Sequence, residues 1–132
     1  MKSKNPFLLF IPALVWTLIV LTATLMPGRD VPHVSIFDRF PHFDKLVHGT
    51  LFFGFVFLWG WAFRQARGMH HLFRLLLFVT LAGIALGIGI EYLQEYVVKR
   101  DFEFLDMVAD ATGAVIGLLL LLLFPQKKKV RG

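Results

Sequence analysis

The stretch Phe104–Phe124, FLDMVADATGAVIGLLLLLLF, decides the fold of this chain of 132 residues. It is apolar and long enough to cross the hydrocarbon core of a bilayer, which takes roughly 20 helical residues. Its first turns nevertheless carry two carboxylates, Asp106 and Asp110. Acids inside a membrane span are costly and therefore need partners or a function. The remaining chain must supply both a membrane bundle and surroundings that these acids tolerate.

Three further apolar runs, at 7–26, 45–63 and 72–93, have the length of a membrane span. Hydrophobic residues make up 57% of the chain and the mean hydropathy is +0.68, more than one small soluble domain could bury. We therefore predict an all-α integral membrane protein, a single domain over 1–132 with four transmembrane helices in a compact bundle. The first run is too long for a signal peptide and no small-x-small cleavage site follows it, so we expect a retained helix.

The positive charges predict an orientation rather than a nucleic-acid partner, although the net charge is +5. With a cytoplasmic N-terminus, nine of the 14 Lys and Arg residues, including the tail KKKVR, fall on the inner side. This asymmetry fits the positive-inside rule and predicts that both termini are cytoplasmic. Residues 27–43 would then form an outer loop, either an interfacial amphipathic segment or a turn-rich loop with aromatic anchors. The absence of cysteine excludes disulfide and thiolate chemistry.

Small residues predict how two of the helices pack. Gly83 and Gly87 form a GxxxG pair in the third run, and Gly113 and Gly117 form another in the fourth. Such pairs let membrane helices approach closely. Because the turn at 97–103 is short, we expect these two helices to be antiparallel neighbours in tight contact.

Three polar clusters, at 44–48, 91–95 and 106–110, fall on the predicted outer side of the bundle. Helical spacing places each cluster on one face of its helix, and His48, Glu91 and Asp110 lie about one to two turns below the surface. We therefore expect one outward-facing polar pocket. Its candidate ligand-binding residues are Asp44, Lys45, His48, Glu91, Gln94, Arg100, Asp106 and Asp110.

Structural roles compete with this interpretation. Asp44 stands where an N-cap belongs, and Asp106 suits the positive end of a helix. Lys45 and Arg100 could extend toward lipid headgroups. Such roles explain interfacial residues better than the deeper His48, Glu91 and Asp110, because caps and helix dipoles act only in the first turn. For these three, the alternatives are buried pairing that holds the bundle together and a functional pocket.

The order of these motifs resembles the VanZ-like family, small bacterial membrane proteins named for a teicoplanin-resistance accessory protein. The family pattern runs D-K-x-x-H, then E-x-x-Q, then Arg followed by D-x-x-x-N-x-x-G, and here it spans about two-thirds of the chain. Two departures stand out: Asp110 replaces the usual Asn, and GTLF at 49–52 follows the histidine where an aromatic and then a Tyr are common. The matching residues are Asp44, Lys45, His48, Glu91, Gln94, Arg100, Asp106, Asp110 and Gly113.

The resemblance implies a bacterial inner-membrane protein linked to lower susceptibility to teicoplanin-type glycopeptides. We expect its outer pocket to bind an anionic or lipid-linked envelope component, such as a cell-wall precursor, through Lys45 and Arg100. We expect no cofactor and no nucleic-acid partner, and the chain has no nucleophile elbow, phosphate-binding Gly loop or HExxH motif.

The alternative hypothesis is an intramembrane enzyme acting on an envelope lipid. His48 with Glu91, Asp106 and Asp110 would suit a divalent ion that activates water, or Glu91 or His48 could act as a general base. Proton or ion translocation is disfavoured because no acid lies in the inner half of any span.

Overall fold

Each apolar run is helical because only a helix pairs all the backbone polar groups of one segment within a bilayer. The structure, a computed structural model, describes residues 5–27, 39–67 and 71–124. A 3₁₀ turn, Pro6–Phe10, leads into α1 (Ile11–Leu25). The turn does not continue as α-helix from Pro6 because Pro12 lacks the amide hydrogen that would bond Leu8. The other helices are α3 (Phe43–Arg67), α4 (Leu72–Leu93), which ends in a π-helical turn at Gln94–Val98, and α5 (Phe104–Leu123).

The prediction of four membrane-spanning helices is confirmed, because four helices have the length and apolarity to cross a bilayer. The chain is therefore a multi-pass membrane protein. α3 extends one turn beyond the predicted end, through Arg64 to Arg67. It also begins one residue before Asp44, so Asp44 lies in the first helical turn and is not the expected N-cap.

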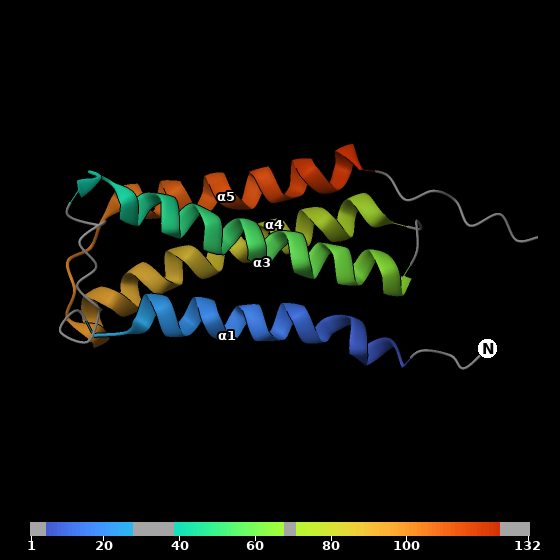
Figure 1. The fold of residues 1–132 in the computed structure, drawn as a ribbon, viewed down its shortest axis with the longest axis horizontal. Helices are drawn as coiled ribbons and strands as arrows, with labels where there is room; N and C mark the ends of the chain where they lie inside the picture. The colour runs from blue at the N-terminus through green and yellow to red at the C-terminus, as the bar shows by residue number, and fades with distance from the viewer. Residues whose placement is uncertain (1–4, 28–38, 68–70, 125–132) are drawn as a thin grey trace, which may run out of the picture.

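The four helices run along one common axis (Figure 1). α3 is the central helix, since it packs against α1, α4 and α5, and its contact with α5 is the most extensive. The core has two layers. Val20, Leu51, Phe52 and Ile90 form the layer nearer the start of α3. Val56, Val79 and Ala114 form the second.

The glycine pair of α5 packs on a different helix than the sequence suggests. A Cβ atom built on Gly113 would overlap the backbone carbonyl of Gly49 on α3, and one on Gly117 would lie 2.9 Å from the Phe53 carbonyl oxygen. α4 and α5 are neighbours as expected, but the closest backbone approach joins α3 and α5. The opposing Gly49 makes this possible, because two glycines facing each other remove both side chains from the interface.

One buried arginine closes the end of the bundle opposite the start of α3. Arg64 is 5% exposed, and its guanidinium donates hydrogen bonds to the carbonyls of Leu121 (2.9 Å) and Phe124 on α5. These carbonyls have no partner inside the helix at its C-terminus, and a cation there also suits the helix dipole. Arg64 therefore caps α5 and ties it to α3.

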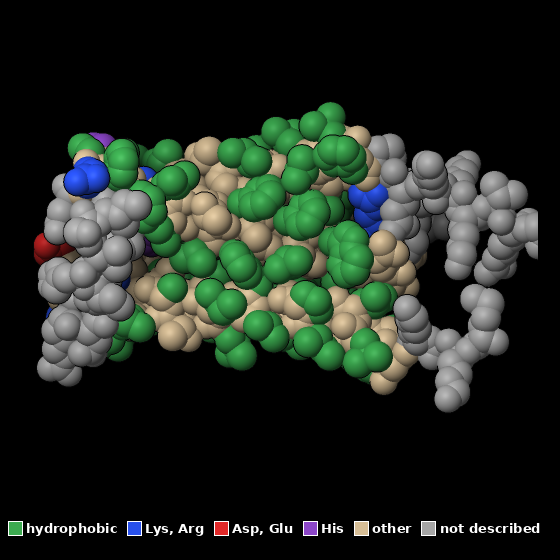
Figure 2. Space-filling view, viewed as in Figure 1, with side chains coloured by type: hydrophobic (Ala, Val, Ile, Leu, Met, Phe, Trp, Pro, Cys, Tyr) green, Lys and Arg blue, Asp and Glu red, His purple; other side chains and the backbone are tan. Residues whose placement is uncertain are grey.

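Charge is divided between the two ends of the bundle. Figure 2 shows apolar side chains over the middle of the visible face and charged groups at the ends. Every Asp and Glu in the described part of the chain lies on α3, α4 or α5 or in their connections, toward the end where α3 and α5 begin. The described residues of the opposite end carry Arg64, Arg67 and Arg74. The predicted basic tail and most of the 27–43 loop lie outside the described residues.

Gly113→Ala should lower the free energy of unfolding by about 1–3 kcal/mol, the usual cost of overpacking, because its Cβ meets backbone atoms that cannot move aside. Unfolding in mixed detergent micelles would measure the loss. Gly89→Ala is the matched control, because its Cβ meets nothing within 4 Å and its stability should not fall. Equal stability of the two variants would contradict the close α3–α5 contact.

Candidate functional site

Lys45 is the centre of an ion-pair cluster at the end of the bundle where α3 and α5 begin. Its Nζ lies 2.6 Å from Asp44 Oδ2 and 2.7 Å from Asp106 Oδ1, and it also pairs with Glu103. The Asp44 and Glu103 side chains are half exposed, whereas that of Asp106 is buried. The lysine thus neutralises carboxylates contributed by α3, by the turn before α5 and by α5 itself.

His48 connects the two acids of α5. Its Nδ1 lies 2.9 Å from Asp110 Oδ1, a hydrogen bond between buried side chains, and its Nε2 lies 3.7 Å from Asp106 Oδ2. His48 is one residue before Gly49, and Asp110 is three residues before Gly113. The close glycine contact between α3 and α5 therefore brings imidazole and carboxylate within bonding distance. The deep acid of the fourth span has the histidine partner that its position requires.

Glu91 completes this polar interior from α4 and is fully buried. Its Oε2 accepts a hydrogen bond of 3.2 Å from the backbone amide of Glu103, which fixes the turn before α5. Donor atoms of His48, Glu91 and Asp110 all lie within 4.8 Å of one another. Three helices thus converge on one buried triad.

Two predicted site residues do not join these contacts. Gln94 is buried, but its amide donates to the carbonyl of Thr24 at 2.7 Å and so ties α4 to the end of α1. Arg100 is partly buried and its backbone amide donates to the Gln94 carbonyl at 2.8 Å. Its guanidinium makes no hydrogen bond or ion pair with the residues that the structure describes. Gln94 therefore has a structural role, and the Arg100 guanidinium makes no ion pair with the cluster formed by the described residues.

Glu103 is the residue that sequence reasoning missed. Its carboxylate pairs with Lys45 and its amide binds Glu91, so it bridges both halves of the site. It belongs to no membrane span, so the unusual placement that marks Asp106 and Asp110 in the sequence does not mark Glu103. The short turn at 97–103 was the available signal, because it places Glu103 at the same membrane depth as Lys45.

Carboxylates outnumber basic groups in this interior. The basic residues are Lys45 and His48. Five acidic residues belong to the same two clusters: Asp44, Glu91, Glu103, Asp106 and Asp110. Uncompensated negative charge is expensive away from water. The buried part of the site, Glu91 and Asp110 beside His48, therefore favours added positive charge, either protons or a cation, whereas Asp44 and Glu103 are half exposed.

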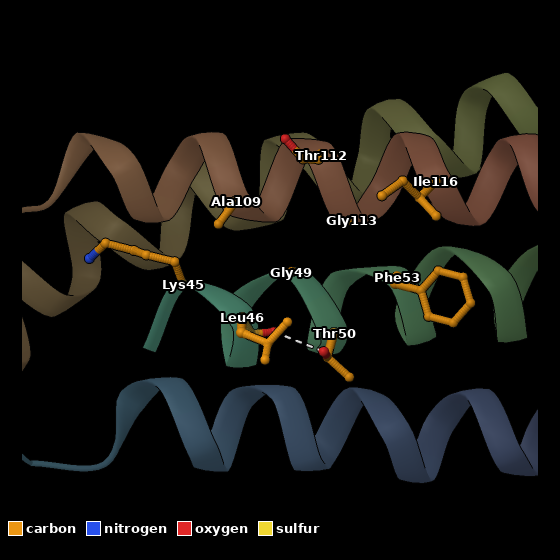
Figure 3. Close-up of a pocket in the computed structure, with 9 residues that line it drawn as sticks. All are labelled: Lys45, Leu46, Gly49, Thr50, Phe53, Ala109, Thr112, Gly113 and Ile116. Atoms are coloured by element: carbon orange, nitrogen blue, oxygen red, sulfur yellow. Dashed lines mark hydrogen bonds between the residues drawn. The ribbon is translucent and has the colours of Figure 1, made fainter. Parts of the chain in front are cut away.

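A groove lies on the surface of the α3–α5 pair next to Lys45. It has a volume of about 490 Å³, and small residues, among them Gly49, Ala109 and Gly113, form its floor. Figure 3 shows Lys45 at one end of the groove, with Phe53 and Ile116 toward the other. Thr50 and Thr112 also line it.

The hydroxyls of the groove are already satisfied. Thr50 donates to the carbonyl of Leu46 at 2.8 Å, and Thr112 donates to that of Val108 at 2.7 Å. Neither needs a partner from a ligand. The groove is therefore an apolar surface depression along the membrane-spanning part of α3 and α5, and it ends at the charged side chain of Lys45.

Lys45→Met should destabilise the fold by about 1–3 kcal/mol at neutral pH, since it leaves three neighbouring carboxylates without their cation. Thermal unfolding in detergent would measure this. The deficit should shrink as pH falls, because protonated carboxyl groups no longer repel one another. Lys99→Met, an exposed lysine at the same end, is the control and should unfold like the wild type at every pH. A deficit independent of pH would contradict the role of Lys45 as a counter-ion.

Comparison with known proteins places little constraint on function. No protein-family model matches the chain, and no solved structure matches it. The chain is similar to the uncharacterized protein C11E3.10 of Schizosaccharomyces pombe (strain 972), with 28% identity over 85 residues. The match covers 64% of this chain and spans about half of the relative's length.

Proposed function

We propose that this protein binds a lipid of the cell envelope, with the lipid chain in the α3–α5 groove and its headgroup at the polar cluster. The observation that carries the proposal is the position of Lys45. It lines the groove and also pairs with Asp106 in the buried interior, so the groove ends at the charged cluster. The acyl chain of an amphiphile lying along α3 and α5 would contact the apolar walls of the groove. Its headgroup would lie beside the charged side chains.

An anionic or lipid-linked headgroup, such as that of a cell-wall precursor, would bind by exchange. Asp44 and Glu103, the half-exposed partners of Lys45, can turn into water and release the ammonium to a phosphate. Asp106 would remain in place, since its side chain is 9% exposed. Arg100, at the same end of the bundle, would supply a second charge-assisted donor. Charge exchange of this kind makes binding dependent on ionic strength.

In our proposal the chain is a VanZ-like protein of the bacterial inner membrane, and lower susceptibility to teicoplanin is its effect on the cell. The support is that the residues of the resemblance from different helices, Lys45, His48, Glu91, Asp106 and Asp110, share one end of the bundle.

We also propose that both termini are cytoplasmic, which makes the polar cluster extracytoplasmic. The described residues of the end opposite the cluster carry arginines and no acids, in keeping with the positive-inside rule. A fluorescent protein fused to the C-terminus should fluoresce in bacteria, whereas alkaline phosphatase fused there should be inactive. The reverse result would place the cluster in the cytoplasm.

Thr112→Phe should abolish lipid retention by filling the groove with a side chain from its exposed wall. Native mass spectrometry of protein extracted from bacterial membranes would count the bound lipid. Thr22→Phe on α1, an exposed threonine outside the groove, is the matched control and should keep the lipid.

In a susceptible host, Thr112→Phe should also lose any protection against teicoplanin that the wild type confers, while Thr22→Phe retains it. Equal lipid retention by both variants, or none by the wild type, would overturn the lipid proposal.

A further inference from the structure

We propose that His48, Glu91 and Asp110 bind one divalent transition-metal ion inside the bundle. The proposal is independent of the lipid in the α3–α5 groove, since none of the three residues lines that groove. They come from α3, α4 and α5, respectively, and their exposed fractions are 6%, 0% and 1%. Donor atoms on all three lie within 4.8 Å of one another.

Each acid of the triad uses one oxygen for the fold and leaves the other free. Asp110 Oδ1 contacts His48 and Glu91 Oε2 accepts the Glu103 amide. Asp110 Oδ2 and Glu91 Oε1 are buried and have no hydrogen-bond partner among the described residues. A buried carboxylate oxygen without a partner costs free energy. The Glu103 amide fixes the orientation of the Glu91 carboxylate, as an outer contact orients a ligand in a metal site, and the imidazole of His48, itself a proposed ligand, holds Asp110 beside it.

The neighbouring acid cluster shows what the triad lacks. Donor oxygens of Asp44, Glu103 and Asp106 also lie within 4.8 Å of one another, and the ammonium of Lys45 pairs with all three. That cluster carries its own cation. The deeper triad has no lysine or arginine partner in the described part of the chain, although its three side chains are buried within the bundle, where charge is costly. A bound cation would supply the positive charge to the triad, as Lys45 supplies it to the neighbouring cluster of Asp44, Glu103 and Asp106.

The donor set indicates the class of ion. One imidazole and two carboxylates suit Zn²⁺ or Mn²⁺, whereas Mg²⁺ and Ca²⁺ prefer oxygen ligands alone. Three protein ligands leave a Zn²⁺ ion with a fourth position for water or a substrate oxygen. Ligands of a tetrahedral Zn²⁺ at about 2.1 Å lie about 3.4 Å apart, so the side chains, whose donor atoms lie within 4.8 Å of one another, need to close by at most about 1.4 Å.

Gly87 on α4 leaves room for the free carboxylate oxygen of Asp110. A Cβ atom there would lie 2.9 Å from Asp110 Oδ2, so the free oxygen faces α4 one turn before Glu91. Gly87→Ala would displace this oxygen while leaving all three ligand groups chemically intact. The variant therefore tests the geometry of the triad separately from its composition.

The experiment is metal titration of the full-length chain in detergent, purified without a chelator and with any affinity tag removed. Calorimetry with Zn²⁺ and with Mn²⁺, together with elemental analysis, should find one ion per wild-type chain. Asp110→Asn and Glu91→Gln should weaken affinity by about 100-fold or more, and Gly87→Ala by at least about tenfold, since loss of even an outer contact costs about 10–100-fold. Glu95→Gln, an acid at the same end outside both clusters, should bind like the wild type.

Three results would overturn the proposal. They are a wild-type chain that binds neither ion, unchanged affinity in Asp110→Asn and Glu91→Gln, and equal loss in Glu95→Gln. Because the first concerns the wild type, it stands even if a variant fails to fold. Lipid retention measured on the same preparations separates this outcome from the lipid proposal, since Thr112→Phe should lose lipid and keep the metal.

Discussion

The contact between Gly49 on α3 and Gly113 on α5 is the constraint on which the rest of the structure depends. The two backbones approach so closely that no Cβ fits on Gly113. Residues within one turn of this contact, His48 and Asp110, are thereby brought to 2.9 Å. If larger residues separated α3 from α5, Asp110 would lose its hydrogen bond to His48. Close packing in the membrane and tolerance of a buried charge thus have one origin.

Electrostatic compensation divides the polar interior into two parts. In the outer part, the ammonium of Lys45 pairs with carboxylates of α3, of the turn before α5 and of α5. The inner part contains His48 as its base, and two of its carboxylate oxygens have no partner among the described residues. Burial makes this difference important, because an unpaired charge costs more as the surroundings lose water. The inner part is therefore where a bound ion would change the energetics most.

The α3–α5 pair presents two different surfaces. On the side toward α4, His48 and Asp110 lie close to Glu91. On the outer side, the pair forms an apolar groove. Lys45 belongs to both, since it lines the groove and pairs with Asp106.

The sequence by itself determined the four membrane spans, because apolar length is a local property and a bilayer permits helices there. It also indicated that His48, Glu91 and Asp110 share one depth, since helical rise follows from residue number alone. Only the tertiary structure decided that Gly113 packs on α3, that Gln94 binds Thr24 and that Glu103 joins the site. Those outcomes depend on how the helices rotate and which faces meet, and a pattern along one chain does not contain the position of another helix.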